Sequence, residues 1–215
     1  MTRTWLLLLG ALATVGFAVI VLIVLPQVVL VDVPVPPELT PRETVATLAQ
    51  DSLIRRGRHV YLQNGCVYCH SQQVRDPAFT TDVERGWGSR ASVPADYVLD
   101  APHVLGTMRT GPDLFDVGRR LPDANWHLIH LYDPRALVEW SIMPAFPFLF
   151  DEREPGDVAA GERVVVIPGA RAPTDRAVVA SADALALVAY LLSLRHDYPV
   201  AAVDSAGART VNTMP

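Results

Sequence analysis

The longest apolar stretch of the chain lies near its N-terminus. Trp5 to Leu25 comprises 21 residues without a charge, and Thr14 carries its only hydroxyl. At a rise of about 1.5 Å per residue, a helix of this length matches the roughly 30 Å hydrocarbon core of a bilayer. No later segment is comparably long and apolar, so the pattern predicts a single-pass membrane protein with residues 1–30 as the transmembrane anchor.

A cleaved signal peptide is the alternative to a retained anchor. Arg3 precedes the apolar run, and Ala11-Leu12-Ala13 resembles a cleavage site. The run is longer than the roughly 7–15 apolar residues of a signal peptide, and cleavage at this site would leave apolar residues at the mature N-terminus. We therefore expect the helix to be retained.

Proline-rich sequence follows the apolar run. Residues 31–41 contain Pro34, Pro36, Pro37 and Pro41, a density that favours extended polyproline II and predicts a stiff linker. Thr40 and Glu43 then have the spacing of a capping box, with proline at the first helical position. This signal predicts a helix over residues 42–56 that ends near Gly57, and a second short helix over residues 58–70.

The rest of the pattern predicts a mainly α domain over residues 42–198 with a small β-hairpin insertion. Glycine, proline and aspartate punctuate residues 71–112, which we expect to be loops. The expected short helices span 126–131 and 134–140, the expected hairpin pairs 162–167 with 177–180, and the last helix spans 183–194 with Ser181 as its N-cap. Residues 199–215 show no periodicity and are predicted to be a disordered tail.

Composition and charge exclude several classes of protein. The net charge is −5 and no basic cluster or recognition motif is present, so nothing indicates nucleic-acid binding. Two cysteines are too few for a disulfide scaffold.

Those two cysteines belong to the strongest motif in the chain, Cys66-Val67-Tyr68-Cys69-His70. Cysteines three residues apart on a helical turn point the same way and can each form a thioether to one haem vinyl group, and the adjacent histidine can bind the iron. A redox-active dithiol would require a preceding strand, and a zinc site would require further cysteines. The motif therefore predicts one covalently bound haem c held by Cys66 and Cys69, with His70 as an axial ligand. Because haem c is attached outside the bacterial inner membrane, the domain is expected on the periplasmic side.

The second axial ligand must come from another part of the chain. Met143 is followed by Pro144, which stiffens the loop that would hold a thioether on the iron, and it is the favoured candidate. Met108 and a second histidine remain alternatives. A metal-bound histidine normally donates its other ring N–H to an oxygen, and the carbonyl of Pro112 is the candidate acceptor for His70, although the same tetrapeptide also suits an ordinary turn.

Arg119 and Arg120 admit two interpretations. They could neutralise the haem propionates, or they could be a solvated basic pair.

Several blocks in order resemble the monohaem cytochrome c subunit of cbb3-type cytochrome c oxidases. They are Gly65–Gln72, Arg109–Leu114, Asp133–Arg135, Met143–Pro147 and the closing Ala186–Leu194. The resemblance implies a class I cytochrome c fold in which His70 and Met143 bind the iron. It also implies a non-catalytic electron-transfer subunit in the bacterial inner membrane. Its implied partners are the bilayer, a cytochrome c donor, and the haem–copper catalytic subunit with the other subunits of the oxidase.

Residues 76–106 and 151–179 depart from the family pattern. The departures leave two alternatives open. One is an electron-transfer subunit of a nitric oxide reductase-like haem–copper enzyme, and the other is a stand-alone membrane-tethered electron shuttle.

Overall fold

A computed structural model describes residues 3–30, 45–171, 173, 175–198, 200–203 and 209–211. Its N-terminal segment is one continuous helix made of α1 (Thr4–Val19), a π-helical turn (Ile20–Val24) and α2 (Leu25–Leu30). The apolar part, Thr4–Val29, spans 26 residues, and none of its side chains is buried. Within the described residues it is the one helix long and apolar enough to cross a membrane, which is consistent with the expected anchor. The linker over residues 31–41 lies outside the described part.

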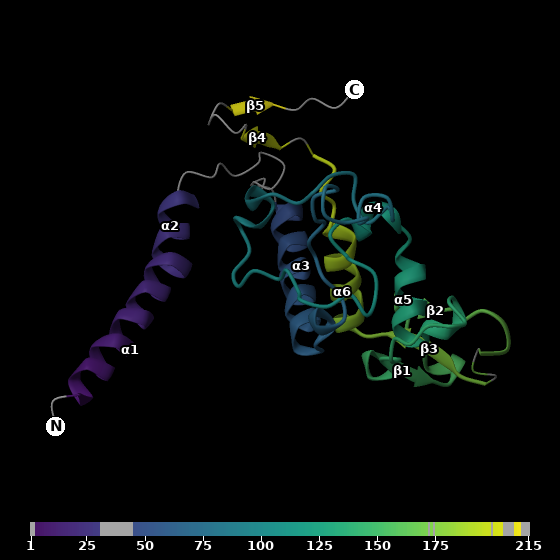
Figure 1. The fold of residues 1–215 in the computed structure, drawn as a ribbon. Coiled ribbons are helices and arrows are strands. Elements are labelled where there is room, and N and C mark those ends of the chain that lie inside the picture. Colours follow the sequence, from purple (N-terminus) through teal and green to yellow (C-terminus); the bar gives the residue numbers. More distant parts are fainter. Residues whose placement is uncertain are drawn as a thin grey trace.

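Two helices lie side by side at the centre of the remaining chain, α3 (Val45–Gln63) and α6 (Ala182–Ser193) (Figure 1). The expected break near Gly57 is wrong, because α3 runs through this position without interruption. Gly57 packs against the backbone of Ala186, so the glycine serves helix contact and not helix termination. The expected N-cap of α6 is confirmed, since the Ser181 hydroxyl accepts a hydrogen bond from the Ala184 N–H at 3.2 Å. The predicted capping box at Thr40–Glu43 lies outside the described residues.

The helix α5 (Ala124–Tyr132) packs on α6 and confirms the short helix expected over residues 126–131. The expected helix over 134–140 is limited to a 3-10 turn at Pro134–Ala136. Trp140 is 85% exposed and does not supply the buried apolar face that would stabilise a longer helix. The other short helical elements are α4 (Val117–Arg120) and 3-10 turns at Cys66–Tyr68, Pro94–Tyr97, Pro147–Leu149, Pro155–Asp157 and Gly169–Arg171.

A small antiparallel sheet lies beside α5, with strand order β1–β3–β2 (Figure 1). Its strands are β1 (Phe150–Arg153), β2 (Val164–Val165) and β3 (Ala177–Ala180). The expected hairpin is confirmed by the pairing of Val164 with Val179, and β1 extends it to three strands. Two further strands, β4 (Ala201–Val203) and β5 (Arg209–Val211), pair within the expected tail. Apart from Val200, the rest of that tail lies outside the described residues.

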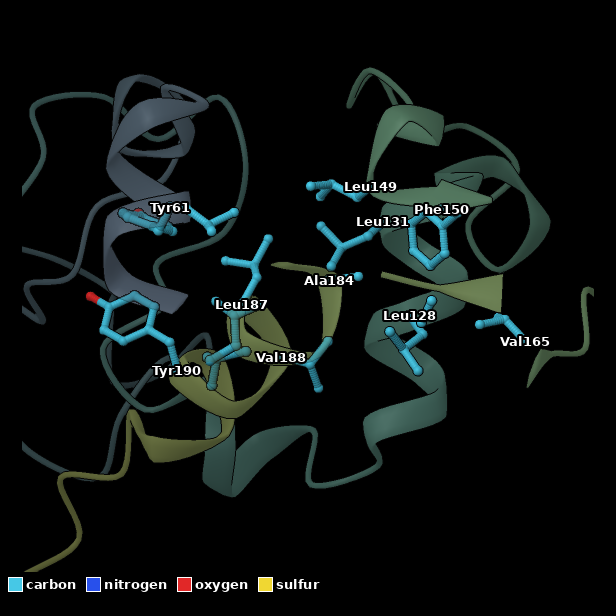
Figure 2. Packing of buried hydrophobic residues seen from close by; sticks show 14 of the residues in the cluster. Tyr61, Leu128, Leu131, Leu149, Phe150, Val165, Ala184, Leu187, Val188 and Tyr190 are labelled. Atoms are coloured by element: carbon cyan, nitrogen blue, oxygen red, sulfur yellow. The ribbon is translucent and has the colours of Figure 1, made fainter. Parts of the chain in front are cut away.

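A continuous hydrophobic core joins α3, α5, α6 and the sheet. Figure 2 shows Leu187 of α6 between Tyr61 of α3 and Leu131 of α5, all three of them buried. Phe150 and Val165 of the sheet lie on the α5 side of this cluster, also buried. The core therefore fixes the end of α3, from which the cysteine motif emerges, against the last helix of the domain.

Candidate haem-binding site

The cysteine motif lies immediately after α3. Gly65 adopts φ 69°, the left-handed conformation that favours glycine, and turns the chain into the 3-10 turn Cys66–Tyr68. The carbonyl of Cys66 accepts hydrogen bonds from the N–H groups of Cys69, at 3.1 Å, and His70, at 2.9 Å. This compact turn brings both cysteines and the histidine to one place, with Cys66 half-buried and Cys69 exposed.

Two tyrosines attach the segment after the motif to the helix pair. The hydroxyl of Tyr61 on α3 donates to the carbonyl of His70 at 3.2 Å. The hydroxyl of Tyr190 on α6 lies 3.0 Å from Nε2 of Gln72, and its ring centroid is 5.5 Å from that of Tyr61. Both rings are buried, so the core determines where the backbone of His70 lies.

The imidazole of His70 is held from a second, distant segment. Its Nδ1 lies 2.7 Å from the carbonyl oxygen of Pro112, and the Gly111 N–H donates to the carbonyl of Cys69 at 2.9 Å. A Cβ at Gly111 would stand 2.3 Å from Cε1 of the ring, so a residue without a side chain is required for this contact. Burial lowers the pKa of His70, opposed by the Pro112 hydrogen bond and the charge of Asp113. A neutral imidazole that donates from Nδ1 presents the lone pair of Nε2 to a metal.

The environment of Cys66 is not that of a nucleophilic thiol. Burial is the largest influence on Cys66 and raises the pKa of its thiol to about 11. A nucleophilic dithiol needs the opposite shift, which a helix N-terminus or a nearby cation supplies. The zinc alternative also lacks support, because the described residues contain no group of three or more His, Cys, Asp or Glu side chains arranged to hold a metal.

The two candidate methionines differ in their environments. Met143 is half-buried and packs against the same core that receives Cys66, whereas Met108 is 56% exposed. The loop of Met143 is fixed to α5, because the Phe146 N–H donates to the carbonyl of Leu131 at 2.9 Å. The arrangement brings Met143 and the cysteine motif onto one core.

Two polar side chains near His70 each have one buried nitrogen atom with no hydrogen-bond partner in the part of the chain that the structure describes. They are Arg120, through Nε, and His130, through Nδ1. Both lie close enough to His70 for an electrostatic interaction. Besides burial, the charge of Arg120 lowers the pKa of His70, and the charge of His70 lowers the pKa of His130. Burial, with smaller effects of His70 and His127, lowers the pKa of His130 to about 4.

The neighbouring Arg119 instead forms an ion pair with Asp116.

The sequence analysis left His130 unassigned. Its i,i+4 spacing from Trp126, on which its ring stacks at 4.7 Å, is the signal that could have drawn attention to it.

The remaining histidines offer little to a metal. His59 and His103 are exposed. His127 is buried with Nε2 2.8 Å from the carbonyl of Leu121, and Nδ1 of His196 is hydrogen-bonded to the carbonyl of Phe115. His130 is therefore the candidate that a bis-histidine site would use.

Comparison with known proteins gives one result. The family model described as cytochrome c oxidase, mono-haem subunit/FixO, matches residues 5–168. The match spans the apolar helix, the cysteine motif, Pro112 and Met143. No curated protein matches the chain.

Proposed function

This chain belongs to the family of mono-haem subunits of cytochrome c oxidase, and from that premise we propose that it relays electrons to the haem–copper catalytic subunit of a cbb3-type terminal oxidase. The observation that carries the proposal is the hydrogen bond between Nδ1 of His70 and the carbonyl oxygen of Pro112, directly beside the two cysteines. It orients an imidazole with one nitrogen engaged and the other free for iron.

The residues around His70 fit a haem. Gly111 leaves room for the imidazole ring to lie against its backbone. Among the described residues, the buried Nε of Arg120 and Nδ1 of His130 have no hydrogen-bond partner. Buried polar atoms are normally hydrogen-bonded, and the propionates of a haem are acceptors suited to both. We therefore assign Arg120 and His130 to the propionates, so the propionate interpretation is kept for Arg120 and not for Arg119, which pairs with Asp116.

Cys66 and Cys69 would hold the haem through thioethers, and His70 and Met143 would be its axial ligands. When bound, the haem supplies a one-electron iron couple, whose potential a histidine–methionine pair raises. The half-buried position of Met143 and the exposure of Met108 support this choice of ligand. The chain itself orients His70, and Phe146 and Ser141 restrain the loop of Met143 through hydrogen bonds to Leu131 and to the Met143 N–H.

We assign residues 42–198 to a class I cytochrome c domain. Its support is the packing of the helix before the motif, α3, against the last helix, α6. The apolar helix near the N-terminus would hold this domain at the periplasmic face of the inner membrane. One spanning helix cannot enclose a buried haem–copper centre, so the oxygen chemistry belongs to a multi-helix partner and this subunit is not itself catalytic.

Haem attachment and ligation are tested first. The denatured protein should keep its haem-dependent peroxidase stain, and the double variant C66A/C69A should lose it. Extraction of the haem by acid acetone would contradict covalent attachment.

The sixth ligand is tested by comparing M143A with M108A and H130A. We expect M143A alone to open the iron to carbon monoxide while the haem stays attached. Carbon monoxide binding in M108A or H130A, and not in M143A, would show that the residue changed in that variant is the sixth ligand in place of Met143.

The partner is tested by purification in mild detergent. We expect a multi-helix haem–copper subunit that reduces oxygen to co-purify with the chain. Purification of the chain alone would favour a tethered shuttle, and a co-purifying subunit that reduces nitric oxide would favour the reductase alternative.

A further inference from the structure

A buried ionic network lies behind the segment that holds His70. Its centre is Asp113, which is fully buried and directly follows Pro112, whose carbonyl oxygen is the hydrogen-bond acceptor for His70. Oδ2 of Asp113 accepts hydrogen bonds from the Ser71 hydroxyl and, at 2.9 Å, from the Gln73 N–H. Oδ1 accepts from the Phe115 N–H at 2.8 Å. One carboxylate therefore joins the segment of His70 to the segment of Pro112.

The charge of Asp113 is balanced by Arg109. Nη2 of this arginine lies 3.6 Å from Oδ2 of Asp113, and Nε donates to the Ser71 hydroxyl at 2.8 Å. A third contact goes to the carbonyl of Gln73. The Arg109 side chain is 17% exposed, so the pair is largely removed from water and its electrostatic interactions are only weakly screened.

Residues 76–106, which depart from the family pattern, hold this arginine in place. Asp82 is 1% exposed, and its Oδ2 lies 2.9 Å from Nη2 of Arg109. The indole of Trp87 faces the guanidinium, whose central carbon lies 5.3 Å from the ring centroid. The second oxygen of Asp82 pairs with Arg75 at 3.0 Å. The charges alternate along the series Arg75, Asp82, Arg109 and Asp113.

We propose that Asp113 and Arg109 are positioning residues that set the redox potential of the haem bound through His70, and that Asp82 and Trp87 hold Arg109 for this purpose. A buried carboxylate beside the axial histidine stabilises the more positive, oxidised iron, and the arginine opposes it. The segment over residues 76–106 thereby gains a function: it completes the charge balance on the histidine side of the haem. This inference rests on the proposed function, because a potential is set only at a bound haem.

The test uses charge changes of opposite sign in the full-length, haem-loaded protein. D113N removes the negative charge and should raise the midpoint potential, whereas R109Q removes the positive charge and should lower it. We expect each to change the equilibrium between oxidised and reduced haem about tenfold, which is about 59 mV for one electron. D82N also removes a buried negative charge, while the contacts of Arg109 with Ser71 and Gln73 remain, so it should shift the potential in the same direction as D113N, by less.

The matched control is D96N. Asp96 is also buried in the 76–106 segment and pairs with Arg90 at 2.7 Å, but its other hydrogen bonds come from the Val93 N–H and the Tyr198 hydroxyl and not from the segment of His70. We expect an unchanged potential in D96N. Loosening of the fold would move the potential in one direction in all variants, so shifts of equal sign in D113N and R109Q, or an equal shift in D96N, would overturn the proposal.

If D113N fails to fold, R109Q and D82N still decide, because their predicted shifts are opposite. A redox titration that finds no shift in either of them overturns the proposal while the haem is attached. Absence of a haem stain in the wild-type protein is a different result, and it would contradict the proposed function instead.

Discussion

A Cβ atom at Gly57 would lie 1.9 Å from the carbonyl oxygen of Ala186 and 2.8 Å from Cβ of Tyr190. The backbones of α3 and α6 therefore approach at a point where only hydrogen fits. The same crossing brings the rings of Tyr61 and Tyr190 to 5.5 Å, and these tyrosines bind the segment around His70. The helix crossing and the candidate haem site are thus parts of one structure.

The first prediction is that G57A destabilises the domain. Replacing glycine by alanine at an exposed position inside a helix raises the free energy of unfolding by about 1 kcal/mol. At Gly57 the clash with Ala186 predicts that this free energy falls by about 1–3 kcal/mol. Thermal unfolding in detergent, followed by circular dichroism, measures the difference. G156A is the control, because a Cβ there meets no atom within 4 Å. An unchanged or higher melting temperature in G57A would show that the helices do not approach so closely.

The second prediction concerns the contact between Gly111 and the His70 ring. In G111A the new methyl group should displace the imidazole and break its 2.7 Å contact with Pro112. Loss of such an outer hydrogen bond typically costs about 10–100-fold in affinity for a metal. We expect the haem to stay covalently attached while its axial ligation weakens, seen as a change from a low-spin towards a high-spin absorption spectrum.

G118A provides the control for this experiment. A Cβ at Gly118 would lie 2.2 Å from the carbonyl oxygen of Leu192, so the packing defect is of similar severity. We expect G118A to reduce stability and leave the haem spectrum unchanged. Equal spectra for G111A and the wild-type protein would be inconsistent with our account of the site.

Elements with a clear local period were predictable from the sequence. α5, α6 and the pairing of β2 with β3 appear where the apolar pattern indicates them. The prediction that the helix ends at Gly57 was wrong. A glycine that ends a helix and a glycine that packs closely inside one can have the same local sequence, and the difference here depends on Ala186, far along the chain. β1 was missed because Phe150–Arg153 lacks a full apolar alternation and is stabilised by pairing with β3.

The candidate site divides in the same way. The cysteine motif is local, and the contact of His70 with Pro112 followed from the need of a metal-bound histidine for an acceptor. The structure places Nδ1 of His70 2.7 Å from the carbonyl oxygen of Pro112, and the role of this contact at a haem stays a prediction. The link of Asp82 to Arg109 was not predictable, because it joins two loops that have no period and are 27 residues apart.

The third prediction is a loss of stability on acidification. Burial, reinforced by Arg90 and opposed by the Phe115 carbonyl, Asp96 and Asp116, lowers the pKa of His196. The unfolded chain then binds more protons below a pH of about 6.5, so stability is fully present above that pH and falls as the pH drops through the folded-state pKa. Each such histidine contributes a slope of up to about 1.4 kcal/mol per pH unit.

Denaturant unfolding between pH 7.5 and 5 measures this slope. H196Q should flatten it, because glutamine does not titrate. H59Q, at an exposed histidine, should not change it. Equal slopes for the wild-type protein and H196Q would exclude His196 as a source of acid sensitivity.

The last prediction is that the apolar helix is retained in the mature protein and holds it in the membrane. Cleavage after Ala13 would leave an apolar N-terminus in which Val15, Phe17 and Leu22 are 61%, 69% and 73% exposed. Exposure of such an apolar surface is unfavourable in water and favourable in the hydrocarbon core of a bilayer. The intact mass should therefore include residues 5–25, and washing membranes with carbonate should not release the protein. The variant A11L/A13L removes the small residues that a signal peptidase requires, and we expect its mature N-terminus and its membrane retention to match those of the wild-type protein. A mature N-terminus near Thr14 that disappears in A11L/A13L would show that the helix is a cleaved signal, and the haem domain would then need another means of staying beside its partner.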